Sequence, residues 1–408
     1  MTERLAPNSE SDVVEAVQWA LAAKTPLEIV AGGSKRALGR PVAAEHSLDL
    51  GSLTGMRDYE PAEMVFDAGP ATPVAEITAE LAAKNQQLAF EPPDLGPLLG
   101  EAEGRATLGG VMACNLSGPR RIKAFAARDH LLGLKAVTGR GEAIKTGGRV
   151  VKNVTGYDLC KLMAGSWGTL GVVTDLTVRA LPAPERTRTV LVFGLDDGRG
   201  LKALRAALAT PHEVSAAAHL PAAIAARSGV SYIMEAGVAV SAVRVEGFGL
   251  SAEARCVALR DALGAFGPVE ELHSKNSGTL WREVRDVAPF AADTAPQVWR
   301  LSLTPDKGAS VVAQIAGVVL GAEAFYDWGG GLVWLALPAR DDAAASVVRG
   351  AVDEAGGHAL LVRASERVRR NTAVFHPQPA ALAALSARLK RGFDPDGVLN
   401  PGRMVAGV

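Results

Sequence analysis

The segment Ala31-Gly32-Gly33-Ser34-Lys35-Arg36 combines residue types that can hold a diphosphate. Glycine exposes backbone amides and allows close approach, a serine hydroxyl donates a hydrogen bond, and lysine or arginine supplies positive charge. The apolar run at 27–30 is expected to be a buried strand that leads into this segment. The segment fits neither the GxxxxGK[ST] phosphate loop nor the GxGxxG dinucleotide fingerprint, so an ordinary turn is the alternative.

A second glycine cluster, GSWGTLG at 165–171, leads directly into Val172-Val173-Thr174. A strand is predicted at 172–180, and it would hold the glycine loop on a rigid support. Such an arrangement suits a large, flat or phosphorylated cofactor. A turn at Gly156-Tyr157-Asp158 precedes the cluster. A glycine-rich turn without a ligand is the alternative interpretation.

Two further segments have similar character. Residues 106–118 read ATLGGVMACNLSG, in which glycines flank an apolar turn of helix, and a basic stretch follows from Arg120. Residues 393–404 read FDPDGVLNPGRM, and the residue before each proline is biased away from helix. The tail is therefore expected to be a fixed irregular segment. A terminal loop that covers a core edge is the alternative for this tail.

Metal chemistry is not expected from this sequence. Its seven histidines form no HxxxH, HxH or HExxH pair, so neither a zinc site nor a non-haem iron site is predicted. Its three cysteines, at 114, 160 and 256, are too few for a self-contained four-cysteine iron–sulfur cluster. Widely spaced free cysteines fit a reducing cytosol, where they pack as small apolar side chains.

Composition narrows the class of protein further. A chain of 408 residues is expected to form two or three domains. The formal net charge of −1 lacks the basic field of a general nucleic-acid-binding protein. No apolar run reaches the roughly 20 residues that a membrane span needs, and the polar N-terminus lacks a signal-peptide core. We therefore expect a cytoplasmic protein, which partners could still hold peripherally at the inner membrane.

The hydrophobic pattern predicts the elements that would position these segments. Helices are expected at 9–24 and 72–84, strands at 46–50, 64–68 and 87–90, and a hairpin at 131–145. From 185 to 370, strands alternate with helices in a pattern typical of helices segregated on an antiparallel sheet. Strands are predicted there at 189–193, 241–247, 298–303, 325–328, 332–337 and 360–362, and helices at 201–208, 252–265, 309–320 and 342–355. The fold class is therefore predicted to be α+β.

Six segments taken together resemble the PCMH-type FAD-binding fold of the vanillyl-alcohol oxidase family. They are AGGSKR at 31–36, ATLGG at 106–110, RDHLLGLKAV at 128–137, KNVTGYDLCKL at 152–162, GSWGTLGVVT at 165–174 and FDPDGVLNPGRM at 393–404. They occur in the family's order. The runs WRLSLTP at 299–305 and YDWGGGLVWLAL at 326–337 are most similar to the FAD-binding subunits of bacterial glycolate oxidase (glycolate dehydrogenase).

The resemblance implies a domain division. An FAD-binding domain would span 1–184, with subdomains at about 1–55 and 56–184. A ferredoxin-like, antiparallel-sheet cap would span 185–370, and a C-terminal segment at 371–408 would return to the FAD domain.

The resemblance also implies non-covalent FAD, since no histidine stands in the AGGSKR loop. The 31–36 loop would hold the diphosphate, and Asn400 with Arg403 would close over the isoalloxazine. The implied cofactor-binding residues are Ala31, Gly32, Gly33, Ser34, Lys35, Thr107, Leu108, Gly109, Gly110, Ser117, Gly118, Tyr157, Asp158, Gly168, Gly171, Val172, Val173, Thr174, Asn400 and Arg403.

Two departures from the family pattern bear on function. Trp167 replaces the acid of the usual GSEGTLG loop, and its bulk raises the alternative of a structural subunit that has lost FAD. Relatives that oxidise lactate or glycolate carry a histidine-rich hairpin in the cap, but the comparable hairpin at 326–334 has no histidine. Hydroxy-acid oxidation needs a base and a cation for the carboxylate. Arg300, Arg282 and Tyr326 are the candidates for catalysis, and no base stands out.

The resemblance therefore implies a subunit of a multi-subunit glycolate oxidase that oxidises glycolate to glyoxylate. Its partners would be a sister FAD-binding catalytic subunit and an iron–sulfur subunit that takes the electrons. The alternative is a stand-alone FAD-dependent dehydrogenase of a small 2-hydroxy acid such as D-lactate. In that case His273, Tyr326 or His376 would supply the base.

Overall fold

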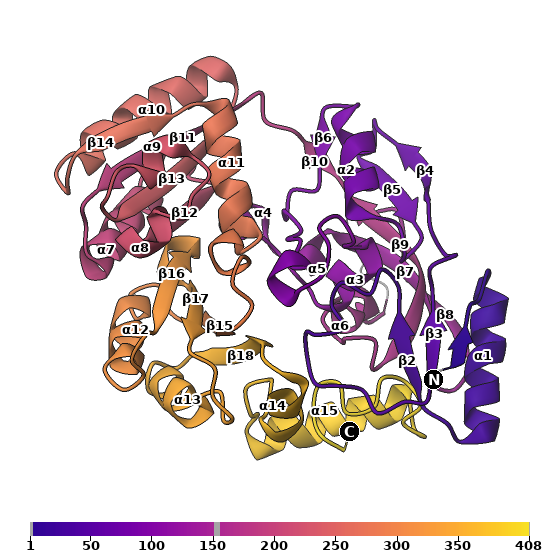
Figure 1. Cartoon of the computed structure of the whole chain (residues 1–408). Helices are drawn as coiled ribbons and strands as arrows, with labels where there is room; N and C mark the ends of the chain where they lie inside the picture. Colours follow the sequence, from indigo (N-terminus) through magenta and orange to yellow (C-terminus); the bar gives the residue numbers. More distant parts are fainter. Residues whose placement is uncertain (1–2, 151–155, 408) are drawn as a thin grey trace.

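The computed structural model describes residues 3–150 and 156–407. Figure 1 shows two lobes, one formed by the N-terminal elements and one by the middle of the chain. Residues 152–155 of the predicted KNVTGYDLCKL segment lie outside the described residues. Within the described ranges, no helix combines the length and apolar character that crossing a membrane requires.

A small parallel sheet begins the N-terminal lobe. Its strands are β1 (Glu3–Leu5), β3 (His46–Asp49) and β2 (Leu27–Val30), in that order. Helix α1 (Glu10–Ala23) begins at Ser9, whose side chain accepts a hydrogen bond from the Asp12 amide in a capping box. Apolar residues at helical spacing on α1 pack with buried residues of β2 and β3, which fixes the strand that leads into the 31–36 loop.

A five-stranded antiparallel sheet completes this lobe. Its order is β4 (Met56–Glu60), β5 (Val65–Ala68), β9 (Gly171–Arg179), β7 (Leu131–Thr138) and β8 (Ala143–Gly147). One core joins it to α2 (Val74–Ala82), α3 (Leu108–Ala113), α5 (Ala127–His130) and α6 (Leu159–Met163). The predicted hairpin is confirmed as β7–β8. The predicted strand at 87–90 is reduced to β6 (Gln86–Gln87), which pairs with β10 (Leu181–Pro182).

The second lobe is built on one eight-stranded antiparallel sheet. Its order is β14 (Val269–Leu272), β11 (Arg186–Phe193), β13 (Val240–Gly247), β12 (Ala216–Leu220), β16 (Glu323–Asp327), β17 (Leu332–Leu337), β15 (Gln297–Ser302) and β18 (His358–Arg363). We call this lobe the cap. Sequence analysis missed β12, because AAAHL is buried at every position and therefore lacks the polar alternation of a half-exposed strand.

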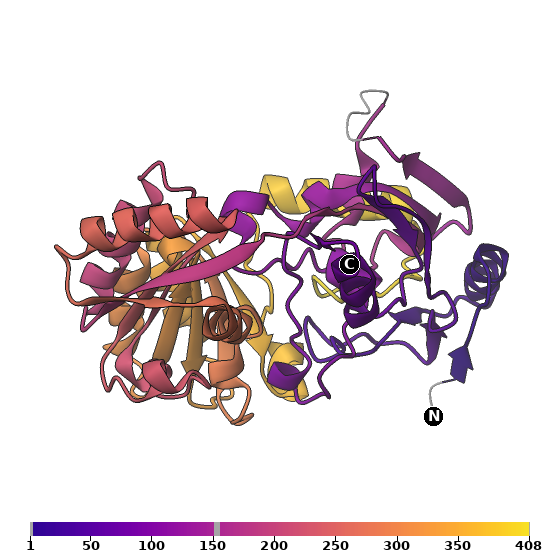
Figure 2. The same cartoon turned by 90° about the horizontal axis from the view of Figure 1, so that it is seen from above.

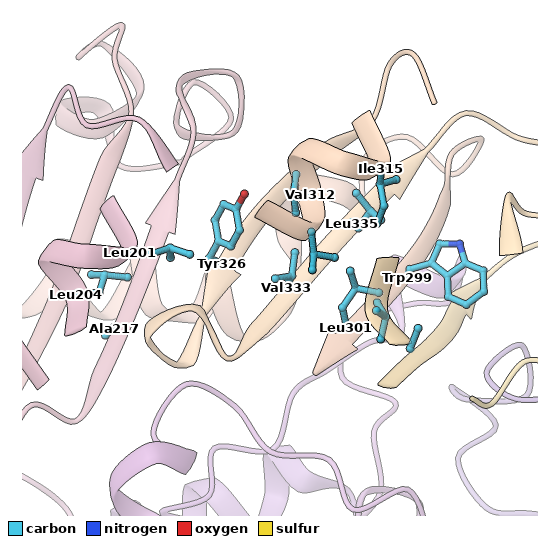
Figure 3. Packing of buried hydrophobic residues seen from close by; sticks show 14 of the residues in the cluster. Leu201, Leu204, Ala217, Trp299, Leu301, Val312, Ile315, Tyr326, Val333 and Leu335 are labelled. Carbon is cyan, nitrogen blue, oxygen red and sulfur yellow. The ribbon is translucent and has the colours of Figure 1, made fainter. Parts of the chain in front are cut away.

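The two faces of the cap sheet have different neighbours. One face packs under α7 (Asp197–Leu208), α10 (Gly249–Leu263), α12 (Gly308–Ala316) and α13 (Ala345–Glu354). Figure 3 shows this core, with Leu201 and Leu204 near Tyr326 and with Val333 and Leu335 between strand and helix. The other face packs on α8 (Ala222–Ala225), α9 (Ser231–Met234) and α11 (Ser274–Arg285), and on residues of the N-terminal lobe.

The end of the chain returns to the N-terminal lobe. After α14 (Glu366–Asn371), helix α15 (Ala380–Phe393) lies against that lobe in Figures 1 and 2. The following tail lies beside β2, because the Leu27 amide donates to the Val398 carbonyl at 2.8 Å and Leu27 pairs with Leu399. The α+β class is confirmed, whereas the domain limits at 184 and 370 stay predictions.

Candidate functional site

Two adjoining cavities lie between the small parallel sheet and the five-stranded sheet. With the open solvent at their mouths included, their volumes are about 650 Å³ and about 570 Å³. They share wall residues from four separate segments, so they form one continuous cleft. The shared residues are Ile29, Val30, Ala31, Gly110, Ala113, Trp167 and Asn400.

The larger cavity has a mainly apolar wall. Its lining includes Leu50, which follows β3, Leu134 and Leu176 from the five-stranded sheet, and Met112 and Met163 from α3 and α6. Such a wall suits a flat ring system, since burial of apolar area stabilises the bound ring. Sequence analysis missed these residues because an apolar side chain beside a ligand has the same pattern as one in the core.

The smaller cavity is formed by the 31–36 loop and the start of α3. Gly33 has φ +74°, a conformation that favours glycine. A Cβ on Gly32 would lie 2.3 Å from the Arg105 carbonyl oxygen, so only glycine fits the close approach of these two segments. The Lys35 ammonium reaches the Gly110 backbone, where an added Cβ would be 3.4 Å from Nζ.

Two buried cations, Lys35 and Arg403, line this smaller cavity. Lys35 Nζ donates to Ser34 Oγ at 3.2 Å, and Arg403 donates to the Lys35 carbonyl at 2.8 Å. Neither side chain forms an ion pair with a residue in the described ranges. Burial lowers the pKa of both groups, because the charged forms lose water. Buried positive charges without carboxylate partners fit an anionic ligand, and this donor set therefore fits the diphosphate of FAD.

Asn400 joins the tail to both walls of the cleft. Its Oδ1 accepts from the Ile29 amide at 2.8 Å, and its Nδ2 donates to the Trp167 carbonyl at 2.9 Å. Asn400 has φ +43°, a conformation that asparagine tolerates better than most residues. Gly168 has φ +69°, and a Cβ there would lie 2.8 Å from Asn400 Nδ2. The glycine loop at 165–171 and the C-terminal tail therefore meet at the cleft, as the sequence predicted.

Trp167 forms part of the cleft wall. Its ring packs edge-on against Phe375 with 5.0 Å between ring centroids, and Trp167 lines both cavities. The indole thus has a packing partner outside the cleft. The structure therefore gives no support to the idea that the bulk of Trp167 blocks the cleft and excludes FAD.

The structure places thirteen of the predicted cofactor residues in the cleft wall. They are Ala31, Gly32, Gly33, Ser34, Lys35, Thr107, Gly109, Gly110, Gly168, Gly171, Val173, Asn400 and Arg403. Leu108 and Val172 are instead buried in the apolar cores beside it. Thr174 donates its hydroxyl hydrogen bond to Glu10 at 2.7 Å.

Four more predicted residues lie away from both cavities. The Ser117 hydroxyl accepts from the Ala127 amide at 2.8 Å. The Gly118 carbonyl accepts from Trp328 Nε1 at 3.1 Å, which ties this segment to the cap. Tyr157 is 93% exposed, and the Asp158 carboxylate caps α6. Roles for these residues in FAD binding stay predictions.

A cluster of charged and aromatic side chains lies where the cap meets the N-terminal lobe. Arg121 from α4 (Arg121–Ala124) lies over the Trp328 ring at 4.4 Å, and Arg300 from β15 lies over it at 5.2 Å. Burial and the nearby Arg121 charge lower the pKa of Arg300 to about 10. Neither arginine side chain has a hydrogen bond or ion pair with a residue of the described chain. We call Arg121, Arg300 and Trp328 the arginine clamp.

Asp327 lies on the same face of the cap sheet as Arg300. Its Oδ1 accepts from the Trp328 amide at 2.7 Å. Burial raises the pKa of Asp327 to about 7, and the Glu91 charge adds to this, while Arg244 and Arg300 oppose it. A buried carboxyl that titrates near neutrality can exchange a proton during a reaction. Sequence analysis missed Asp327 because a lone aspartate in a glycine-rich hairpin usually serves a turn.

The three catalytic candidates predicted from the sequence lie in different places in the structure. Arg300 faces the N-terminal lobe, but Arg282 is on the exposed side of α11. Tyr326 is on the helix-covered face, where its hydroxyl donates to Asp197 at 2.5 Å. Tyr326 and Asp327 face opposite ways because successive strand residues point to opposite faces. These positions give no support to catalytic roles for Arg282 and Tyr326, which stay predictions.

The two histidines considered as bases are engaged elsewhere. His273 Nδ1 lies 3.0 Å from an Arg188 nitrogen at the far edge strand of the cap. His376 Nε2 pairs with Asp353 at 2.8 Å at the end of α13. No group of three or more His, Cys, Asp and Glu side chains suited to a metal ion occurs within residues 3–150 and 156–407.

A buried ion network fixes the junction of the two lobes. Arg244 of the cap pairs with Glu91 of the N-terminal lobe at 2.8 Å, and Arg120 pairs with Glu246 at 2.8 Å. Burial alone would raise the pKa of Glu246, but Arg244 and Arg120 hold it well below its usual range. Because each buried charge has an opposite partner, the network resists separation of the lobes.

Comparisons with known proteins agree with this architecture. A family model described as an FAD binding domain matches residues 4–147. The p-cresol methylhydroxylase structure has a TM-score of 0.71 at 15% identity and covers 99% of this chain and 88% of its own. That likeness shows the PCMH-type fold.

Two curated relatives have glycolate oxidase names. Glycolate oxidase subunit GlcD of Bacillus subtilis is 38% identical over 29% of this chain and 24% of its own. Glycolate oxidase subunit GlcE of Escherichia coli is 34% identical over 97% of this chain and 97% of its own. The cleft, the FAD-domain match and this full-length similarity lead to one conclusion: the chain belongs to the FAD-binding GlcE family of glycolate oxidase subunits.

Proposed function

We propose that the chain is the FAD-binding subunit of a multi-subunit glycolate oxidase that takes part in oxidising glycolate to glyoxylate. One observation carries the cofactor part: the buried cations Lys35 and Arg403 line the glycine-walled cleft without carboxylate partners in the described chain. The full-length similarity to the E. coli subunit supports the assignment to a complex.

The chain's own residues would bind and enclose the cofactor. Lys35, Arg403 and the backbone of the 31–36 loop would hold the diphosphate, and the apolar cavity would take a ring and exclude water from it. When bound, FAD supplies a two-electron acceptor for the hydrogen on the hydroxyl-bearing carbon. Asn400 would keep the cleft walls in place during this step.

We also propose a sister FAD-binding subunit and an iron–sulfur subunit as partners. The GlcD similarity supports the first. The chain has three cysteines, fewer than a four-cysteine cluster needs, so electrons would leave through a partner.

Reconstitution of the complex with and without this chain tests the proposal. We expect flavin absorbance from the isolated chain, and glycolate-dependent reduction of the iron–sulfur clusters only when all subunits are present. Cluster reduction that is unchanged without this chain would contradict its role. Sustained turnover by the isolated chain at the rate of the complex would instead favour a stand-alone dehydrogenase.

The stand-alone dehydrogenase is the second candidate function. The arginine clamp and Asp327 favour it, because together they supply a carboxylate-binding cation and a titratable acid within this chain. A screen of small 2-hydroxy acids, glycolate and D-lactate included, with an artificial dye as acceptor would decide between the two functions.

A further inference from the structure

The loop at 35–40 connects the smaller cavity of the cleft with the cap. Lys35 lines that cavity together with Arg403, which donates to the Lys35 carbonyl at 2.8 Å and to the Arg40 carbonyl at 3.1 Å. The Arg40 amide donates in turn to the Arg403 carbonyl at 3.0 Å. The loop is therefore bound at both ends by an arginine that also lines the cavity.

The same loop is bound by residues 366–375, in which the chain leaves the cap. We call them the exit segment, and Figure 1 shows its helix α14 between β18 and α15. Arg369 of α14 donates from Nη1 to the Gly39 carbonyl at 2.8 Å. Arg40 donates to two backbone carbonyls of the exit segment, at 2.8 and 3.2 Å. Because the bonds run in both directions, the loop and the exit segment are held in place together.

Gly39 is the residue at which these contacts meet. Its φ is +87°, a conformation that favours glycine. A Cβ there would lie 3.1 Å from Arg403 Nε and 3.3 Å from a ring carbon of Trp167, and both side chains line the smaller cavity. The Trp167 ring also packs edge-on against Phe375 of the exit segment. Gly39 thus contacts the wall of the cavity on one side and Arg369 on the other.

Three buried cations, Lys35, Arg369 and Arg403, surround this loop. None of them forms an ion pair within the part of the chain that the structure describes. The two arginines donate to backbone carbonyls, which do not cancel a positive charge. Burial lowers the pKa of Arg403, and the charge of Arg369 lowers it further. Buried like charges cost free energy, and a dianion such as the diphosphate of FAD would offset that cost.

We propose that Arg369 is a positioning residue of the FAD site: it holds the 35–40 loop against the diphosphate, and the bound diphosphate in turn holds the exit segment on the N-terminal lobe. Arg369 lines neither cavity and acts through Gly39. This inference rests on the FAD-binding part of the proposed function and goes beyond it, because it makes docking of the exit segment depend on the cofactor. Such coupling is reciprocal, so an anchored exit segment strengthens FAD binding by the same factor.

Hydrogen exchange of the full chain, followed by mass spectrometry, tests the coupling. FAD should slow exchange in the exit segment by about fivefold or more. It should leave α10 unchanged, since α10 packs on strands at the other end of the cap sheet from β18. Bound ADP, which has a diphosphate but no flavin ring, should slow the exit segment in the same way, whereas riboflavin, which has no phosphate, should not.

Variants of Arg369 separate charge from structure. Arg369→Met should weaken FAD binding by about tenfold in calorimetric titration of the FAD-free chain. It should also lower the unfolding midpoint more with FAD than without it, because the charge is favourable only beside the diphosphate. Arg369→Lys keeps the charge and should stay within about threefold of the wild-type affinity. Arg370→Met is the matched control, since this neighbouring arginine is exposed and pairs with Glu366.

Each part of the inference can fail separately. Exit-segment exchange that is equal with and without FAD would overturn the coupling, and this measurement needs no variant. An inactive ADP, or a riboflavin effect equal to that of FAD, would overturn the role of the diphosphate charge. Wild-type FAD affinity in Arg369→Met, or equal losses of midpoint with and without FAD, would overturn the positioning role. If the wild-type chain bound no FAD at all, the proposed function would fail as well.

Discussion

The side-chain amide of Asn400 donates to the Trp167 carbonyl at 2.9 Å, across 233 positions of sequence. The same side chain accepts from the Ile29 amide at 2.8 Å, so a single residue near the C-terminus joins both walls of the cleft. The cofactor site is therefore complete only when the tail has returned to the N-terminal lobe. Variants that remove the contacts of Asn400, or those of the buried ion network, can therefore test how the cleft and the junction of the lobes are held together.

Asn400→Ala should loosen the cleft. The substitution removes two buried hydrogen bonds and leaves the Ile29 amide and the Trp167 carbonyl without partners, at a cost of about 2–4 kcal/mol in the free energy of unfolding. We expect at least a tenfold weaker affinity for FAD, measured by quenching of flavin fluorescence. Asn371→Ala, at an exposed position in α14, is the control. Unchanged FAD affinity in Asn400→Ala would show that the cleft walls hold together without the tail.

Lys35→Met should separate cofactor affinity from stability. The variant loses a buried cation that has no carboxylate partner in the described chain, so its affinity for FAD should fall by about 10- to 100-fold. The unfolding midpoint of the FAD-free protein should not fall, because an unpaired buried ammonium costs free energy. Titration of apoprotein with FAD and thermal unfolding measure the two effects. Lys84→Met, an exposed position after α2, controls for the change of charge. Equal FAD affinity in the variant and the wild type would show that Lys35 does not bind the cofactor.

Arg244→Ala should weaken the junction of the lobes. It leaves Glu91 and Glu246 with fewer opposite charges in a buried place, and we expect a loss of about 3 kcal/mol in urea unfolding. Because Arg244 and Arg120 hold the pKa of Glu246 down, wild-type stability should drop as pH falls below about 4.5, and the variant should lose less over that range. Arg367→Ala, which breaks an exposed pair with Asp341, should cost less than about 1 kcal/mol. Similar losses for both variants would contradict a structural role for the network.

Asp327→Asn should change how stability depends on pH. Burial raises the pKa of Asp327 from 3.8 to about 7, so within this range the folded protein holds a proton that the unfolded chain has released. Wild-type stability relative to the variant should therefore be greatest below pH 4 and fall by about 1 kcal/mol per pH unit up to about pH 7. Urea midpoints at pH 5, 6, 7 and 8 test this. Parallel curves for wild type and variant would show that Asp327 titrates normally, and Asp341→Asn, which is exposed, provides the reference.

Much of the cleft could be predicted from sequence because its requirements are local. Gly33 and Gly168 have positive φ, and such positions favour glycine whatever the rest of the fold does. The strand before the 31–36 loop and the strand at 172–180 are visible as apolar runs, and both occur as β2 and β9. Local signals of this kind are enough to predict where the backbone amides and hydroxyl groups of the cleft occur in the chain.

The apolar wall and the tail contacts could not be predicted in the same way. Leu134 and Met163 line a cavity, but their patterns match those of core residues, because burial next to a ligand and burial next to protein select the same side chains. Likewise, the sequence at 393–404 indicates a rigid segment but contains nothing that pairs Asn400 with Trp167.

The sequence by itself determined the glycine-rich loops of the cleft and, through the predicted strand at 325–328, that the neighbours Tyr326 and Asp327 would face opposite ways. Only the tertiary structure decided which of the two faces the FAD-binding lobe. It buried Tyr326 under α7 and placed Asp327 on the opposite face with Arg300, because α7, α10, α12 and α13 cover one face of the cap sheet and the N-terminal lobe packs on the other. It also brought Arg121 and Arg300 to the same indole, that of Trp328, an arrangement between lobes that depends on the packing of the whole chain and leaves no local trace in sequence.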